Sequence, residues 1–271
     1  MKKRKPIDKQ NIKKKALPYE SKSTIVVYLV LRALVVFTLV WAAVNKQWES
    51  VFTCVLVLVL FLMPSIVEKR FSFKMPSTLE IIILFFIFAA EILGELQAFY
   101  IKYHFWDTML HTTNGFLCAA FGYGMVDLLN RNDKIKMQLS PFFLAFVSFC
   151  FSMTIGVLWE FFEFGMDRIF LTDMQKDTVV NVISSTMLDP TASNKSVIIR
   201  NVTDVVVNGE NLGLGGYLDI GLFDTMKDLF VNFIGAVVFS VIGFFASRNR
   251  SENKITENLV PKLANNKDEK K

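Results

Sequence analysis

The chain has 271 residues, of which 52% are hydrophobic and 27 are Phe, and its formal net charge is +5. A soluble domain of this length normally has shorter apolar runs that charges interrupt, so the composition excludes an ordinary soluble protein. The basic run near the N-terminus, Lys2-Lys3-Arg4-Lys5 with Lys13-Lys14-Lys15, lacks interleaved aromatic residues and precedes a long apolar run. These two features argue against a nucleic-acid partner.

Apolar runs along the chain are long enough to cross a hydrocarbon core, which takes about 20 helical residues. We therefore predict an all-α integral membrane protein, a bundle of six transmembrane helices. The predicted helices are at about 24–44, 51–67, 79–100, 109–129, 140–163 and 226–246, with boundaries good to about 2–4 residues.

The orientation follows from the Lys and Arg residues. With the N-terminus inside, 22 of them fall in the segments placed in the cytoplasm and 6 outside, as the positive-inside rule demands. Both termini are therefore predicted to be cytoplasmic. The predicted organisation is a basic N-terminus (1–23), helices one to five (24–164), an extracytoplasmic loop (165–225), the last helix (226–246) and a disordered cytoplasmic tail (247–271).

The long loop before the last helix contains β-branched runs, at 179–183, 197–199 and 205–207. Asp189-Pro190 and Asn208-Gly209 supply turn chemistry between and after these runs. We predict a small β hairpin or three short strands. A long loop beside a polar site is often a lid or binding loop, and a tolerated surface insertion is the alternative.

Acids and one histidine lie near the same end of four predicted helices. Ionisable groups inside a span are costly, usually face a bundle interior or a cavity, and indicate a functional site. At about 100° per residue, those on each helix share one side, so four helices are predicted to face one another. The catalytic candidates are Asp107, His111, Glu160 and Glu163; the metal-ligand candidates are these four with Asp224 and Asp228; the supporting candidates are Glu91, Glu95, Asn114 and Asn232.

The charge balance of this cluster limits its chemistry, because His111 and Lys227 are the nearby bases embedded in spans. The carboxylates cannot all stay ionised, so either some are protonated or a cation sits among them. Protonated carboxyls suit acid–base catalysis or proton-coupled transport. A divalent metal ion held by carboxylates and an imidazole would activate water or orient a phosphate. A polar network that only fixes helix register is the alternative.

The motifs of this cluster, in their order, resemble the YjdF-like group of uncharacterised bacterial inner-membrane proteins over about residues 25–246. This resemblance implies a multi-pass protein of the bacterial plasma membrane and supplies no catalytic roles. The matching residues are Trp106-Asp107 with Leu110-His111 and Gly115, Trp159-Glu160 with Glu163, and Asp224-Thr225 with Asp228-Leu229 and Gly235.

A more distant likeness is to VanZ-like proteins, which are associated with glycopeptide resistance. Glu163 stands where that group tends to have Gln, and the long outer loop is extra, so both features depart from its pattern. The likeness rests on Asp107-x-x-x-His111 and on Asp228-x-x-x-Asn232-x-x-Gly235.

Three function classes follow from these observations. The first is an outward-facing centre of acidic residues and His111 whose activity depends on a metal ion or on protons. This centre would act on an envelope or lipid-linked component, with membrane lipids as its surroundings. The second is a proton- or cation-coupled transporter that uses the same carboxylates. The third is a non-enzymatic scaffold. The chain lacks the G-x-S-x-G, H-E-x-x-H and P-loop motifs, and the sequence predicts neither the substrate nor the oligomeric state.

Overall fold

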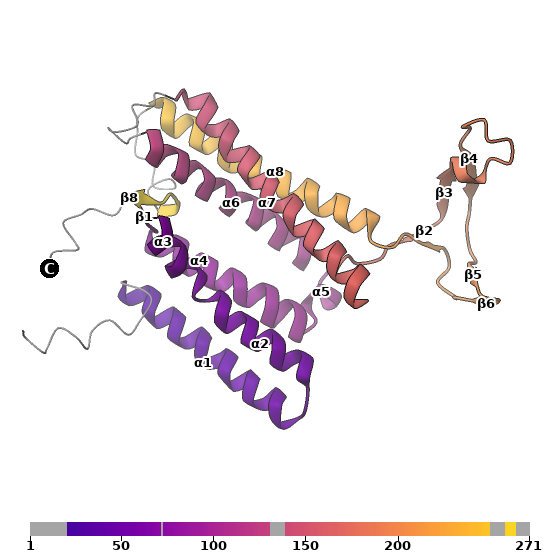
Figure 1. Cartoon of the computed structure of the whole chain (residues 1–271), viewed down its shortest axis with the longest axis horizontal. Helices are drawn as coiled ribbons and strands as arrows, with labels where there is room; N and C mark the ends of the chain where they lie inside the picture. The colour runs from indigo at the N-terminus through magenta and orange to yellow at the C-terminus, as the bar shows by residue number, and fades with distance from the viewer. Residues whose placement is uncertain (1–20, 72, 131–138, 250–257, 264–271) are drawn as a thin grey trace, which may run out of the picture.

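The computed structural model describes residues 21–71, 73–130, 139–249 and 258–263, and it is mostly helical (Figure 1). Long helices run roughly antiparallel along one axis, with a strand-containing segment extending from one end of the bundle. The helices are α1 (Lys22–Val44), α2 (Trp48–Leu60), α3 (Met63–Phe71), α4 (Ser77–Ile87), the π-helix η2 (Phe88–Leu96), α5 (Phe99–Lys102), α6 (Trp106–Asn130), α7 (Pro141–Phe170), the 3₁₀ turn η3 (Thr186–Leu188) and α8 (Leu222–Asn249).

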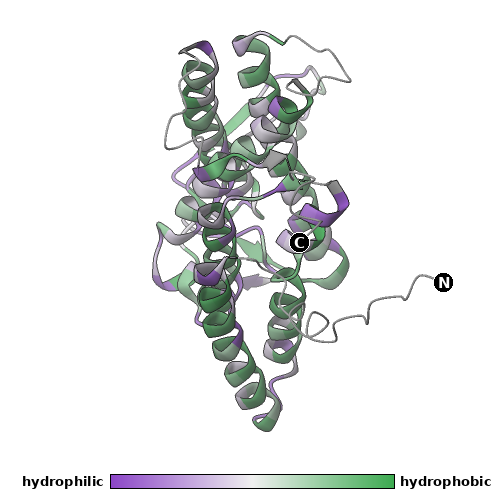
Figure 2. Cartoon of the chain, turned by 90° about the vertical axis from the view of Figure 1, so that its left-hand side faces the viewer, coloured by the Kyte–Doolittle hydropathy of each residue, from purple (hydrophilic) through white to green (hydrophobic). Residues whose placement is uncertain are grey.

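Four of the helical segments in the described part of the chain are long and apolar enough to cross a membrane: 22–44, 48–70, 141–170 and 222–248. Their outer faces carry large apolar side chains, and Figure 2 shows hydrophobic residues covering most of the helices. The predicted multi-pass membrane protein is thereby supported. The predicted third and fourth spans also form helices, although the third is divided and α6 carries the polar residues of the predicted site.

The helices form two groups, each around its own apolar core. In the first, α1, α2, α4 and η2 enclose Tyr28, Val35, Val57 and Leu84. In the second, α6, α7 and α8 pack on one another. The core of the second group includes residues on α6, α7 and α8 and extends to the chain around β1 and β8; among its members are Ala119, Tyr123, Leu144, Ala236 and Phe239.

Two predicted helices differ from the structure in continuity. The predicted span 51–67 is interrupted by a turn at Phe61 and Leu62, between α2 and α3. The predicted uniform α-helix at 79–100 is wrong, because α4 continues as the nine-residue π-helix η2, which ends before Ala98. Ala98 has a left-handed backbone (φ 56), which turns the chain into α5. Long π-helical segments are rare and often occur at functional sites.

The boundaries of α7 have local causes. Ser140 caps its start by accepting a hydrogen bond from the Phe143 amide (3.2 Å), with Pro141 in the first turn, a favoured arrangement at helix starts. At its other end α7 continues to Phe170, beyond the predicted boundary at 163. The loop between α7 and α8 therefore occupies 171–221, inside the predicted range of 165–225.

The loop contains short antiparallel strand pairs and extends away from the helices (Figure 1). The predicted hairpin is β3 with β4, in which Ile183 pairs with Ile199. Asn208 and Gly209, both with positive φ, form the turn between β5 and β6, as a tight hairpin turn requires. The strands are β2 (Val179–Val180), β3 (Val182–Ser185), β4 (Val197–Arg200), β5 (Val206–Val207), β6 (Glu210–Asn211) and β7 (Tyr217–Leu218), and β2 pairs with β7.

The tail at 247–271 was predicted to be disordered, but this is wrong for its described parts, 247–249 and 258–263, of which 247–249 belong to α8. Strand β8 (Lys262–Leu263) pairs with β1 (Phe73–Lys74), and Leu259 and Val260 are buried in the second core. Apolar side chains in an otherwise polar tail provide this anchor. The rest of the tail beyond Asn249 and the N-terminus at 1–20 lie outside the described residues. In Figure 1 the start of α1, the end of α8 and β8 lie at one end of the bundle, opposite the loop.

Candidate metal centre

The site lies where α6 and α8 touch backbone to backbone. A Cβ atom added to Gly115 would lie 2.1 Å from the Asn232 carbonyl oxygen, and one added to Gly235 would lie 2.0 Å from that of Thr112. Only glycine permits so close an approach, a known means of packing membrane helices. These two glycines therefore set the distance between the polar residues of α6 and those of α8.

The predicted supporting residues Asn114 and Asn232 meet below the charged cluster. The Asn114 amide donates to Asn232 Oδ1 (3.3 Å), and the Asn232 amide points to the sulfur of Met153 at 3.7 Å. A Cβ on Gly156 would lie 2.6 Å from the Asn232 amide nitrogen, so α7 also makes room for this side chain. The buried Asn232 thus joins all three helices of the second group.

Asp107, His111 and Asp228 converge above these asparagines. His111 Nε2 lies 3.4 Å from Asp107 Oδ1 and 3.7 Å from Asp228 Oδ2. One donor atom from each of the three residues lies within 4.8 Å of the other two, so together they form a group able to hold a metal ion. Asp228 is 1% exposed, which makes an isolated charge there costly. The structure therefore brings together one imidazole and two carboxylates from α6 and α8.

Lys227 lies on the other side of these carboxylates. Its ammonium donates to Asp107 Oδ2 (2.9 Å) and to Asp224 Oδ1 (3.0 Å), and it lies 3.5 Å from Asp228 Oδ1. Asp107 and Asp228 each turn one oxygen to Lys227 and the other to His111. Asp224 faces Lys227 and the loop instead, so the structure places it at the edge of the cluster rather than with His111.

Glu160 and Glu163 reach the cluster from α7 in different ways. Glu160 Oε1 lies 3.9 Å from His111 Nδ1, on the side of the ring opposite the aspartates. Glu160 is buried, and its Oε2 has no hydrogen-bond partner among the described residues. Glu163 is also buried and accepts a hydrogen bond from the Trp159 indole (2.9 Å). Glu160 therefore belongs to the centre, whereas the contact of Glu163 is with its own helix.

Glu91 and Glu95 do not share the environment that the sequence predicts. Glu91 lines a cavity of about 360 Å³ together with His111 and Asn114, whereas the side chain of Glu95 is exposed. The prediction for Glu95 assumed α-helical periodicity, which η2 does not have. The π-helix is wider, so positions that share one side of an α-helix are displaced around it.

Hydrogen bonds that the sequence analysis missed attach the start of the loop, at 174–176, to α7 and α8. Asp167 accepts hydrogen bonds from the amides of Met174 (2.7 Å) and Gln175 (2.8 Å). The next amide, of Lys176, donates to Asp224 Oδ2 at 2.8 Å, and the Gln175 side chain donates to Thr225. An Asp in the last turn of α7 is the sequence signal, because such carboxylates commonly accept from nearby loop amides. The loop is thereby fixed to the start of α8.

Tyr100 was also missed as a part of the cavity wall. Its ring lies against Gly94, where an added Cβ would be 2.4 Å from Tyr100 Cε2. The left-handed residue Ala98 reverses the chain after η2 and brings α5 back against it. The sequence gives one signal for this contact, a glycine beside the two glutamates. Alanine seldom adopts positive φ, so the turn itself has no clear sequence signal.

Comparison with known proteins places the chain among membrane proteins. It is 29% identical over 107 residues to an uncharacterised protein of Thermotoga maritima, a match that covers 39% of this chain and 53% of that protein. The chain thus spans about half the length of this relative. No solved structure matches the chain significantly. The YjdF-like and VanZ-like resemblances remain predictions. The family described as "Predicted membrane protein (DUF2238)" matches residues 27–249, and the chain belongs to this family.

Proposed function

We propose that this protein is a divalent-metal-dependent hydrolase of the membrane, with its centre at the extracytoplasmic end of six membrane-spanning helices. The observation that carries the proposal is the arrangement of three donor atoms, His111 Nε2, Asp107 Oδ1 and Asp228 Oδ2. Three protein ligands with a further position left for water or substrate are the pattern of catalytic zinc sites.

The distances between these donors favour a metal ion over direct hydrogen bonds. Two donors bound at about 2.1 Å to a tetrahedral ion lie about 3.4 Å apart. The imidazole nitrogen lies 3.4 Å from the Asp107 oxygen and 3.7 Å from the Asp228 oxygen. Hydrogen bonds from nitrogen to oxygen are usually no longer than about 3.2 Å. The separations therefore suit ligands of one small ion.

Each proposed ligand also has a partner on its far side. Lys227 contacts the second oxygens of Asp107 and Asp228, and Glu160 faces the second ring nitrogen of His111. Metal-binding imidazoles and carboxylates usually have such outer partners, which fix their orientation. The Lys227 ammonium also offsets part of the negative charge. An imidazole with two carboxylates suits zinc or a similar first-row divalent ion.

The reaction proposed for this centre is hydrolysis of an ester or phosphoester bond at a polar headgroup. A divalent ion held by Asp107, His111 and Asp228 would polarise a water molecule, whose oxygen would form the new bond to the carbonyl carbon or phosphorus while the bond to the leaving oxygen breaks. One proton of that water would pass to the leaving oxygen, so that the products are an acid and an alcohol. Glu160, on the far side of the imidazole ring, would hold the Nδ1 proton of His111 and so orient Nε2 towards the ion. The burial of Glu160 and its position 3.9 Å from Nδ1 support this positioning role.

The test is elemental analysis of detergent-purified protein loaded with Zn²⁺. We expect about one zinc per chain in the parent protein and in Asp189→Ala, a control in the distant loop. The double variant His111→Ala, Asp228→Ala should retain its helix content and lose the metal. Equal metal content in the double variant, or a metal-free parent after loading, would refute the metal centre.

The proposed side of the membrane rests on two observations. Along the sequence, Lys and Arg are concentrated before α1, from the last turn of α3 to the start of α4, between α6 and α7, and after α8, and that bias marks the cytoplasmic side. The start of α1 and the end of α8 lie at the same end of the bundle (Figure 1). The loop lies at the opposite end (Figure 1). A Ser193→Cys variant in intact cells should react with a membrane-impermeant thiol reagent. Reaction only after permeabilisation would place the loop in the cytosol.

A proton-coupled transporter is the second candidate, and one observation favours it. His111 lies between carboxylates on both sides, with Asp107 at 3.4 Å from one nitrogen and Glu160 at 3.9 Å from the other. Such alternation of carboxylates and imidazole occurs in proton relays. Metal-free protein with pH-dependent ion flux in liposomes, abolished in His111→Ala, would favour this candidate over the hydrolase.

A further inference from the structure

We infer that the cavity beside the centre holds the hydrocarbon tail of an amphipathic lipid whose polar head reaches His111. This inference rests on the proposed function and specifies its substrate class. The cavity has a volume of about 360 Å³, within the range of about 300–1,000 Å³ that is usual for small-molecule sites. Its lining comes from both helix groups, from α2, α4 and η2 on one side and α6 and α7 on the other, and from Tyr100 on α5.

Polar and apolar groups divide the lining. The polar members are Glu91, Tyr100, His111 and Asn114, with the indole of Trp159. His111 is shared with the metal-ligating group, so the cavity is continuous with the proposed centre. The remaining lining is hydrocarbon, from Leu60, Phe86, Ile87, Ala90, Leu110, Ile155 and Leu158.

The position of the cavity along the helices suits a tail rather than a small polar molecule. Glu160 of α7 lies beside His111, and Ile155 lies five residues further along α7 in the direction of its start, about 8 Å deeper at 1.5 Å per residue. The cavity therefore continues from the level of the centre towards the middle of a hydrocarbon core about 30 Å thick. A headgroup at His111 would place an attached chain in this direction.

The cavity also has a route to the lipid. Leu158 and Trp159 line it and are 54% and 40% exposed, on the outer surface of α7. The first and second helix groups meet mainly through the contacts of η2 and α5 with α6. A chain can therefore enter sideways between the groups without passing through water, as an amphipathic lipid requires.

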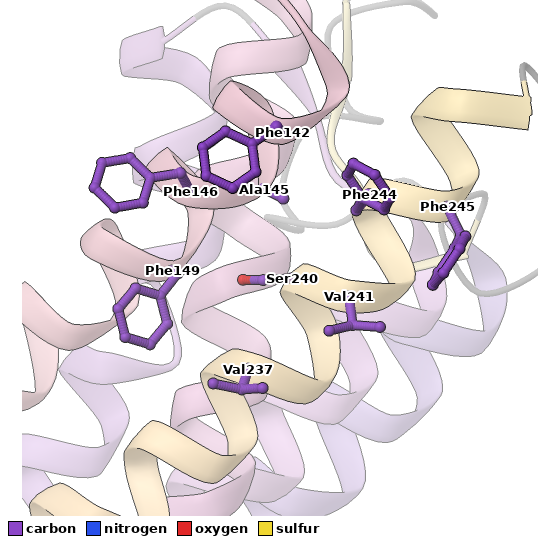
Figure 3. Close-up of a pocket in the computed structure, with 9 residues that line it drawn as sticks. All are labelled: Phe142, Ala145, Phe146, Phe149, Val237, Ser240, Val241, Phe244 and Phe245. Atoms are coloured by element: carbon purple, nitrogen blue, oxygen red, sulfur yellow. The ribbon is translucent and has the colours of Figure 1, made fainter.

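A second groove provides an internal comparison. It has a volume of about 330 Å³ and lies between α7 and α8, lined by Phe142, Ala145, Phe146 and others (Figure 3). Its one polar lining side chain is Ser240, and no titratable side chain lies in the lining. A lipid chain covering this groove would have no headgroup site beside it. It therefore represents ordinary contact with bilayer lipid.

The position of a bound chain is a better test than its affinity, because a tail gains no hydrophobic transfer energy when it moves from lipid into a cavity. The probe is a long-chain alkyl phosphonate with a photoreactive diazirine near the end of the chain, added to zinc-loaded protein in nanodiscs. Crosslinked peptides are identified by mass spectrometry, with an excess of the same phosphonate lacking the diazirine as competitor. The phosphonate head is a metal ligand that resists hydrolysis.

We expect competable crosslinks on the cavity lining, at 86–91, 110–114 and 155–159. Ala90→Phe, which fills the cavity, should reduce them at least tenfold and keep the zinc content of the parent. The matched control Ala145→Phe, in the groove of Figure 3, should keep both. Two results would overturn the inference. One is crosslinks spread over the outer faces of the helices and centred on 142–149 and 237–245. The other is crosslinks that remain unchanged in Ala90→Phe.

The zinc content separates this inference from the proposed function. Zinc bound with diffuse crosslinks would leave the metal centre in place and refute the tail site. Competable cavity crosslinks in a protein that binds no zinc would support the tail site and refute the metal centre. A chelator should abolish the cavity crosslinks of the parent if both proposals hold.

Discussion

Replacing Gly235 with Ala should move α8 away from α6 and disrupt the proposed metal centre two turns away. The added Cβ would lie 2.0 Å from the Thr112 carbonyl oxygen, whereas ordinary contact begins at 3.4 Å. Because the obstructing atom belongs to the backbone of α6, it cannot rotate away. The helices would have to separate by about 1.4 Å to restore normal contact.

This separation exceeds what a metal site tolerates. If α8 moves as a rigid helix, the distance of 3.7 Å between His111 Nε2 and Asp228 Oδ2 increases to about 5 Å. Metal–ligand distances vary by only about 0.2 Å around their preferred values, so both residues could no longer bind one ion. Overpacking of this kind should also cost about 1–3 kcal/mol of stability.

The assay is zinc content after purification and dialysis, with circular dichroism to verify that the variant is helical. Gly165→Ala is the matched control, because an added Cβ there meets nothing within 4 Å. We expect one zinc per chain in Gly165→Ala and close to none in Gly235→Ala. A folded Gly235→Ala protein that binds zinc as the parent does would show that the glycine contact does not position the ligands.

Three further outcomes follow from the structure. Glu160→Gln should weaken zinc binding about 10–100-fold in a chelator competition, because the outer partner of the His111 imidazole loses its charge. Unchanged zinc affinity would contradict the role of Glu160 as that partner. Trp159→Phe removes the indole donor to buried Glu163 and should lower the free energy of unfolding by about 1–3 kcal/mol. An unchanged denaturation midpoint would show that this hydrogen bond does not stabilise the fold. In the exposed loop, hydrogen bonds from Thr191 hold the pKa of the Asp189 carboxyl well below its usual range. The turn should be protected above pH about 4 and loosen as the pH falls further, when the carboxylate becomes protonated. Amide exchange corrected for intrinsic rates would report this, and pH-independent protection would count against it.

The helical architecture was largely predictable because lipid imposes simple requirements on sequence. Long apolar runs indicated the helices, and α7 and α8 lie close to their predicted positions. The turn of Asn208 and Gly209 formed where its backbone preferences indicated. These features depend on neighbouring residues, and the sequence displays such local signals directly.

The π-helix and the anchored tail were not predictable by the same reasoning. Periodicity analysis assumes 3.6 residues per turn, so it placed Glu95 on the same side as Glu91, whereas in η2 the Glu95 side chain is exposed. Leu259 and Val260 are too few to mark a structured segment in a polar tail, and their burial depends on a surface supplied by distant residues. Tertiary contacts decide both features.

At the contact of α6 and α8, some features of the site were predictable from the sequence and others were not. Shared helix faces indicated that His111 and Asp228 would face the bundle interior, and the structure brings them together. The sequence did not indicate that Lys227 would face the second oxygens of both aspartates. That arrangement depends on side-chain geometry across a helix contact, which spacing alone does not determine.

X-ray absorption at the zinc edge of the loaded protein tests the metal centre most directly. The account predicts one imidazole nitrogen and two carboxylate oxygens at about 2.0–2.2 Å from the ion, with the imidazole signal absent in His111→Ala. A shell without imidazole in the parent, or one unaltered by that substitution, would contradict it.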